Sequence, residues 1–130
     1  MSVSNNFMRL GVLSALVGMS LGVWMGAAEN FTLRPVHAHV NLLGFASMML
    51  FGLFYRAVPE AARGKLPMAH FILSVIGFLI LTPALTWMLL GHPEIVPVLA
   101  VSEIMLVASM LLFVVIVFRA TGRNSSTVAA

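Results

Sequence analysis

Four long apolar runs constrain the fold of this chain more than any other feature of its sequence. They cover residues 7–27, 35–58, 68–90 and 95–118. A helix needs about 20 mostly apolar residues to cross the hydrocarbon core of a bilayer. Only 8% of the residues are charged, against roughly 25% in a soluble domain, so the runs predict membrane spans. We expect an all-α, integral membrane four-helix bundle in a single transmembrane domain (1–130), with a polar, frayed tail at 121–130.

The basic residues indicate how such a bundle is oriented. One end of it carries Arg9, Arg56, Arg63, Lys65, Arg119 and Arg123. The other end carries only Arg34, together with Glu29 and Glu94. The positive-inside rule therefore places both termini in the cytoplasm. The formal net charge of +3 does not indicate a nucleic-acid partner, because the basic residues are scattered between apolar runs and form no patch.

Small and aromatic residues mark packing faces and membrane boundaries. The first run carries Gly18, Gly22 and Gly26 at four-residue spacing, a pattern that lets two helices approach closely in a membrane. Trp and Tyr are enriched where a span meets the headgroup layer. We expect Trp87 at the outer boundary, as for Trp24, and Tyr55 at the inner one.

The second run carries its polar residues on one side. At about 100° per residue, His37, Asn41 and Gly44 fall on one stripe of a helix. His39 falls on nearly the opposite stripe, which is otherwise aliphatic and includes Leu43. We therefore expect His37 to face the bundle. His39 is expected to face lipid, a neighbouring subunit or the headgroup layer.

This arrangement suits a haem. Imidazole is a common haem ligand, and a haem in a helical bundle also needs small residues around it and cations near its propionates. His37 with Asn41 supplies a ligand and room, and Arg34 lies one turn outward, where it can pair with a propionate. His92 lies at a compatible height for the opposite ligand. The alternative is that His37 is an interface histidine bonded to water or to a carbonyl. His70 is expected to be a structural histidine at the cytoplasmic start of the third helix.

A Cu or Zn site is a second use of the same histidines, with His92 and Glu94 as further ligands. On a regular helix His37 and His39 point roughly 200° apart and cannot bind one ion. They can do so only if Pro35 leaves the first turn unwound. The chain contains no cysteine, which excludes thiolate ligands and disulfides.

Glu103 lies eight residues into the fourth run, about 12 Å along a helix. A carboxylate at this depth is costly and is by default a candidate functional group. It is a candidate proton site near a cofactor. The alternative is a protonated glutamic acid bonded to Ser102 or to another helix. In either case we expect Glu103 to face protein or water and not lipid.

The stretch LRPVHAHVNLLGF at 33–45 resembles the second transmembrane helix of haem–copper oxidase subunit I, above all in the C-family oxidases and their nitric oxide reductase relatives. In that family a Leu-Arg-Pro-x-His pattern introduces the helix whose histidine ligates the low-spin haem b. The corresponding residue here is His37. The following LFGLFYRAVP extends the resemblance to 33–59. The four histidines of this chain are too few for two haems and a copper, so the resemblance implies haem binding and not a complete oxidase.

We therefore expect a membrane haem b protein of the oxidase-subunit-I type. It would serve electron transfer or the binding of NO or O₂ in respiration, in the bacterial inner membrane. The haem would lie within one chain or be shared in a homo-oligomer or a larger membrane complex. Two other classes of protein stay open: a non-haem Cu- or Zn-binding protein, and a cofactor-free accessory or assembly subunit of a respiratory complex.

Overall fold

The computed structural model describes residues 2–128, and the side chains of residues 2–122. It confirms the all-α fold with four helices long and apolar enough to span a membrane. The first span is α1 (Val3–Ala28). The second consists of α2 (Arg34–His39), the π-helical segment η1 (Val40–Ser47) and α3 (Met48–Ala57). The short 3₁₀ turn η2 (Pro59–Ala62) leads to α4 (Leu66–Leu89), and η3 (Pro93–Ile95) leads to α5 (Val96–Val128).

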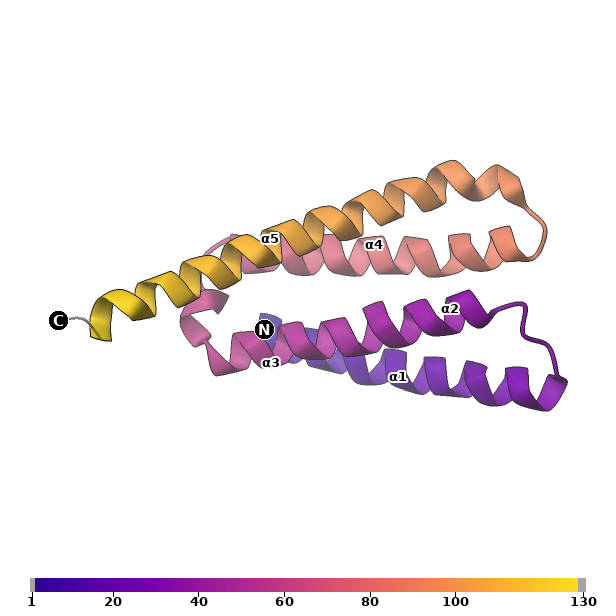
Figure 1. Ribbon diagram of the computed structural model, residues 1–130, viewed down its shortest axis with the longest axis horizontal. Coiled ribbons are helices and arrows are strands. Elements are labelled where there is room, and N and C mark those ends of the chain that lie inside the picture. The colour runs from indigo at the N-terminus through magenta and orange to yellow at the C-terminus, as the bar shows by residue number, and fades with distance from the viewer. Residues whose placement is uncertain (1, 129–130) are drawn as a thin grey trace.

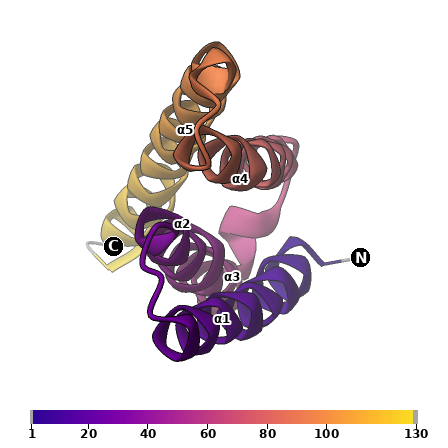
Figure 2. The ribbon, with the colours of Figure 1, turned by 90° about the vertical axis from the view of Figure 1, so that its right-hand side faces the viewer.

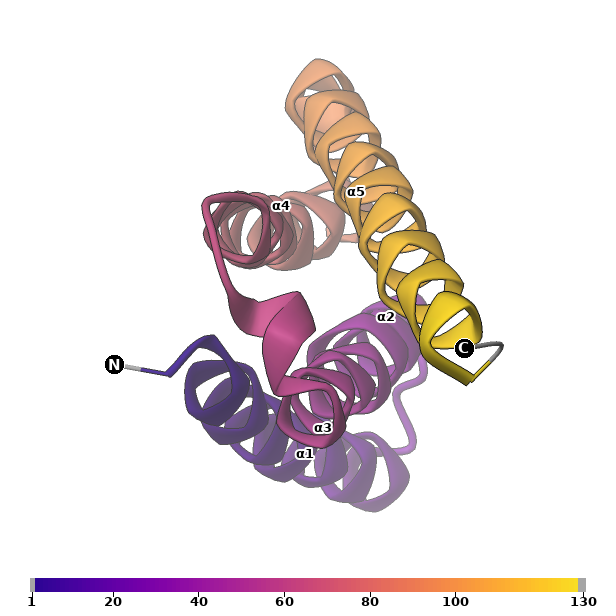
Figure 3. The ribbon, with the colours of Figure 1, turned by 90° about the vertical axis from the view of Figure 1, so that its left-hand side faces the viewer.

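The spans form two antiparallel helix pairs (Figure 1). In one pair α1 packs against α2, η1 and α3, and in the other α4 packs against α5. The loops 29–33 and 90–92 lie at one end, called the loop end below, and both termini lie towards the opposite end, the termini end. Figures 2 and 3 show α5 crossing α4 at an angle on the outside of the bundle.

Local sequence explains where most helices begin and end. Pro35 and Pro67 occupy first-turn positions, where the missing N–H costs least. The first helix ends at Glu29, whose φ of 50° is left-handed and whose N–H bonds to the Gly26 carbonyl. The predicted frayed tail is wrong as far as Val128, because α5 continues to that residue. No proline follows the apolar part of α5, and each added helical residue gains a backbone hydrogen bond.

The core runs along the whole bundle, and its aromatic part lies towards the termini end. Rings from all four spans meet there: Phe7, Phe51, Tyr55, His70 and Phe113. Tyr55 lies two residues before the end of α3, at the height predicted for the inner boundary, but its side chain is only 2% exposed and its ring belongs to the core. Most large apolar side chains outside the core are exposed on the bundle surface, as expected for helices that face lipid.

Candidate functional site

His37 lies half-buried between α1 and α2. Its Nδ1 is 2.8 Å from the carbonyl oxygen of Gly18 on α1. A carbonyl can only accept a hydrogen bond, so Nδ1 carries the proton, and Nε2 of the neutral ring keeps a free lone pair. The predicted inward orientation of His37 is confirmed. The bond to a carbonyl fits both the haem-ligand interpretation and the alternative of an interface histidine.

Two glycines of α1 make this contact possible. A Cβ at Gly22 would lie 2.9 Å from Cε1 of His37, and a Cβ at Gly18 would lie 2.6 Å from Nδ2 of Asn41. Asn41 is held in turn by a 2.8 Å bond from its Nδ2 to the carbonyl oxygen of His37. The predicted glycine stripe is therefore confirmed at two positions, where it packs within the chain. It is not confirmed at Gly26, where a Cβ would meet no atom within 4 Å.

The π-helical segment η1 follows directly after the two histidines and was not predicted. Its wider turn is visible in the bond from Ser47 Oγ to the carbonyl oxygen of Leu42, five residues back, at 2.9 Å. Gly44 in this segment packs against both helix pairs. An added Cβ would lie 2.5 Å from Phe78 Cζ on α4 and 2.8 Å from Ser14 Oγ on α1. Segments of this kind are frequent at functional sites.

The other predicted site residues of α2 point elsewhere. The Nδ1 of His39 bonds to the Pro35 carbonyl oxygen at 2.7 Å, and the first turn is a regular α-helix. The unwound first turn that would let both histidines bind one ion is therefore not observed. Arg34 is exposed, and its guanidinium carbon lies 5.4 Å from the centre of the Phe31 ring.

His92 is engaged by residues on its own side of the bundle. Its ring stacks on Trp87 at 4.1 Å, and its Nδ1 is 3.1 Å from a carboxylate oxygen of Glu94. His92 belongs to the loop 90–92, and His37 belongs to α2, which begins at the same loop end (Figure 1). Within the part of the chain that the structure describes, no hydrogen bond or ring contact joins the two histidines. No group of three or more metal-binding side chains occurs there either.

Neither His37 nor His92 lines the two larger cavities between the helices. One, of about 310 Å³, is lined by Val17 on α1, Val40 on η1 and Phe78 on α4, with other mostly apolar residues. The other, of about 460 Å³, is lined by Pro83 and Trp87 of α4 and by the start of α5. Among the described residues, the chain by itself does not bring a second histidine opposite His37.

Glu103 is exposed on the outer side of α5. Among the described residues it makes no hydrogen bond or ion pair, and Ser102 instead donates to the carbonyl oxygen of Leu99 at 2.6 Å. The alternative bond between Glu103 and Ser102 is therefore not observed. The expectation that Glu103 faces protein or water and not lipid stays a prediction, because its exposed side chain can still meet either of them outside this chain.

A second polar pair, which the sequence did not reveal, lies in the aromatic core. The hydroxyl of Tyr55 is 2.9 Å from Nδ1 of His70, and both side chains are buried. The Nε2 of His70 is buried without a partner, and the rings of Phe51 and Phe113 lie 4.5 and 5.2 Å from the imidazole. The structural interpretation of His70 fits this position. The sequence feature that could have revealed the burial of Tyr55 is its position one turn after Phe51, on the inward side of α3.

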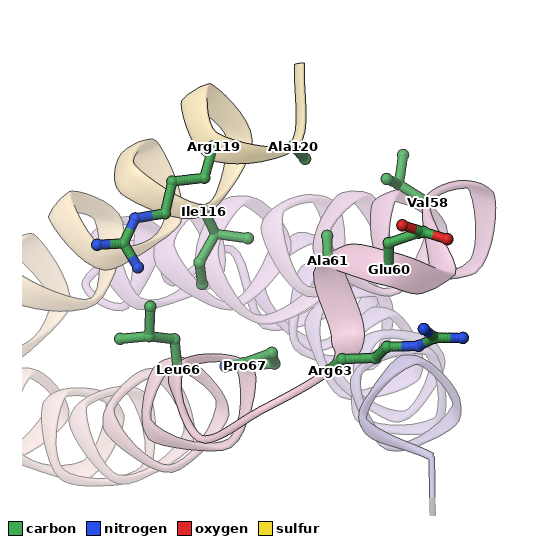
Figure 4. A pocket seen from close by; sticks show the side chains of 9 residues that line it. All are labelled: Val58, Glu60, Ala61, Arg63, Leu66, Pro67, Ile116, Arg119 and Ala120. Atoms are coloured by element: carbon green, nitrogen blue, oxygen red, sulfur yellow. The ribbon is translucent and has the colours of Figure 1, made fainter. Parts of the chain in front are cut away.

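A polar cavity of about 170 Å³ opens at the termini end. Figure 4 shows Arg119 of α5 and Leu66 at the start of α4 on one side of it, and Glu60 and Arg63 on the other. The two guanidinium groups point apart in this view, so they do not converge on one position in the cavity.

No protein-family model, curated protein or solved structure matches this chain. The likeness of 33–59 to oxidase subunit I therefore stays a prediction.

Proposed function

We propose that this integral membrane protein binds haem b, with His37 as a ligand of the iron. The observation that carries the proposal is the bond between Nδ1 of His37 and the carbonyl oxygen of Gly18. Histidines that bind metals almost always donate their other ring N–H to a carbonyl or carboxylate, which orients the ring and raises its basicity. The bond leaves Nε2 as the free donor atom, which suits an axial ligand.

The surroundings of His37 are compatible with this role. Arg34 lies one turn towards the loop end, is exposed and has no acidic partner among the described residues, so it is free to bind a propionate. Gly26, one turn beyond Gly22 on α1, leaves open space beside the site. The bound haem would supply one-electron chemistry or a position for NO or O₂. The role of the chain is to orient the ligand and hold the propionates.

Two arrangements of the haem differ in which residue supplies the second ligand of the iron. His92 lies at the same end of the bundle but is stacked on Trp87 and bonded to Glu94. A second copy of His37, in a homo-oligomer or a larger membrane complex, needs no such rearrangement. We therefore favour a haem shared between chains, with Asn41 beside His37 and with neither Asn41 nor His39 on the iron.

A cofactor-free accessory subunit of a respiratory complex is the second candidate. It is favoured by the fact that the hydrogen bond from His37 to the Gly18 carbonyl already joins α2 to α1 without any cofactor. The Cu- or Zn-binding alternative has less support, because the helical first turn directs His37 and His39 apart. We also propose that both termini are cytoplasmic in a bacterial inner membrane, from the excess of basic residues at the termini end.

Purification with an absorption spectrum tests the proposal. We expect a Soret band in detergent-purified protein produced with an adequate haem supply. His37→Ala should abolish the low-spin spectrum, whereas His39→Ala, the matched control two residues away, should largely keep it. Protein without a Soret band would refute haem binding. Elemental analysis of the same sample would then separate a Cu or Zn protein from a cofactor-free subunit.

A further inference from the structure

Glu103 lies near the middle of the membrane span. A Cβ added at Gly77 would lie 3.0 Å from Cγ of Leu106, so these two residues are at the same height in the antiparallel pair α4–α5. Gly77 is the twelfth residue of α4, which has 24 residues. Glu103 precedes Leu106 by three residues, about 4.5 Å along the helix axis. The carboxyl group therefore belongs at the depth where water is scarcest.

The side of α5 that carries Glu103 is exposed. The buried face of α5 packs against α4 through Leu99, Ser102 and Ser109. Away from this face runs a row of exposed residues at alternating spacings of three and four: Ala100, Glu103, Val107, Met110 and Val114. Glu103 lies within this row, which we call the α5 seam. A strict seven-residue repeat is the pattern by which two helices pack along their whole length.

We infer that the α5 seam is the interface of a homodimer, in which Glu103 of one copy bonds to Glu103 of the second copy. Two parallel copies related by a twofold axis along the membrane normal bring identical residues together at identical heights. A protonated carboxyl group has one donor and free acceptor positions, so it is complementary to an identical group. The inference does not depend on haem binding.

A second copy of the chain is a better partner for the carboxyl group of Glu103 than lipid is. A carboxyl group that faces hydrocarbon has no partner there, and ionisable residues within spans almost always face protein or water. The chain offers no exposed basic side chain at this depth among its described residues, since its arginines and its lysine lie towards the ends of the spans. The partner that this surface specifies by itself is therefore the same carboxyl group in a parallel copy.

The experiment measures dimer formation by single-cysteine cross-linking in native membranes and by sedimentation in detergent. The chain contains no cysteine, so each introduced thiol is the only one. We expect Val107→Cys on the α5 seam to form a covalent dimer under mild oxidation. Leu13→Cys, exposed on α1, is the matched control and should stay monomeric.

Variants of Glu103 test the polar contact. Glu103→Leu should weaken the dimer by roughly 3- to 20-fold, the range measured for hydrogen bonds between membrane helices. Glu103→Gln should stay close to the original affinity, because an amide also donates and accepts. Neither change touches a packed residue, so the fold should survive both. A monomeric protein in membranes, equal cross-linking at Leu13→Cys, or a dimer insensitive to Glu103→Leu would each overturn the inference.

Discussion

The contact between Gly22 and His37 is the most direct test of how this bundle holds its candidate site. In Gly22→Ala the added Cβ would lie 2.9 Å from Cε1 and 3.3 Å from Nδ1 of the imidazole. The first distance is too short for two carbon atoms. The ring cannot simply move away, because its Nδ1 is bound to the carbonyl oxygen of Gly18 at 2.8 Å. Either the hydrogen bond breaks or the two helices separate.

The size of the effect follows from three contributions. Overpacking of a close interface costs about 1–3 kcal/mol, and the lost hydrogen bond about 0.5–1.5 kcal/mol. The higher helix propensity of alanine offsets about 1 kcal/mol. We therefore expect Gly22→Ala to lower the free energy of unfolding by about 0.5–3.5 kcal/mol, as the sum of these ranges. Gly26→Ala is the control, because its Cβ would meet nothing within 4 Å, and it should be neutral or slightly stabilising.

Reversible unfolding in mixed micelles of mild detergent and SDS, followed by circular dichroism, measures this difference. Haem content at equal protein concentration gives a second reading. A Gly22→Ala variant as stable as Gly26→Ala would show that the α1–α2 contact is looser than the structure has it. The hydrogen bond to the Gly18 carbonyl would then not be what orients the His37 ring.

Two further predictions concern the core and the orientation. Tyr55→Phe removes the hydrogen-bond partner that the buried His70 imidazole has among the described residues. We expect a loss of about 1–3 kcal/mol in the same unfolding assay. An unchanged stability would mean that the pair contributes nothing. If both termini are cytoplasmic, an impermeant thiol reagent applied to intact cells should label Asn30→Cys and not Ser126→Cys. The reverse pattern would show that the bundle has the opposite orientation in the membrane.

Local sequence was sufficient for the spans and for the inward side of the second helix. Hydropathy over about 20 residues is a local property, so the four spans were predictable to within a few residues, apart from the extension of α5 to Val128. The stripe of His37, Asn41 and Gly44 was predictable because it combines polar and small residues on one side of a helix. Helical periodicity then places those residues together whatever the rest of the fold is.

Tertiary structure alone decided which helices are neighbours and which sides face outward. In a membrane the lipid-facing side of a helix is as apolar as its packed side, so hydrophobicity does not distinguish the two. For this reason the exposed position of Glu103 and the burial of Tyr55 against His70 could not be derived from the sequence. Both depend on the angle at which α5 crosses α4 and on how the two helix pairs meet, and these are set by contacts between residues far apart in the chain.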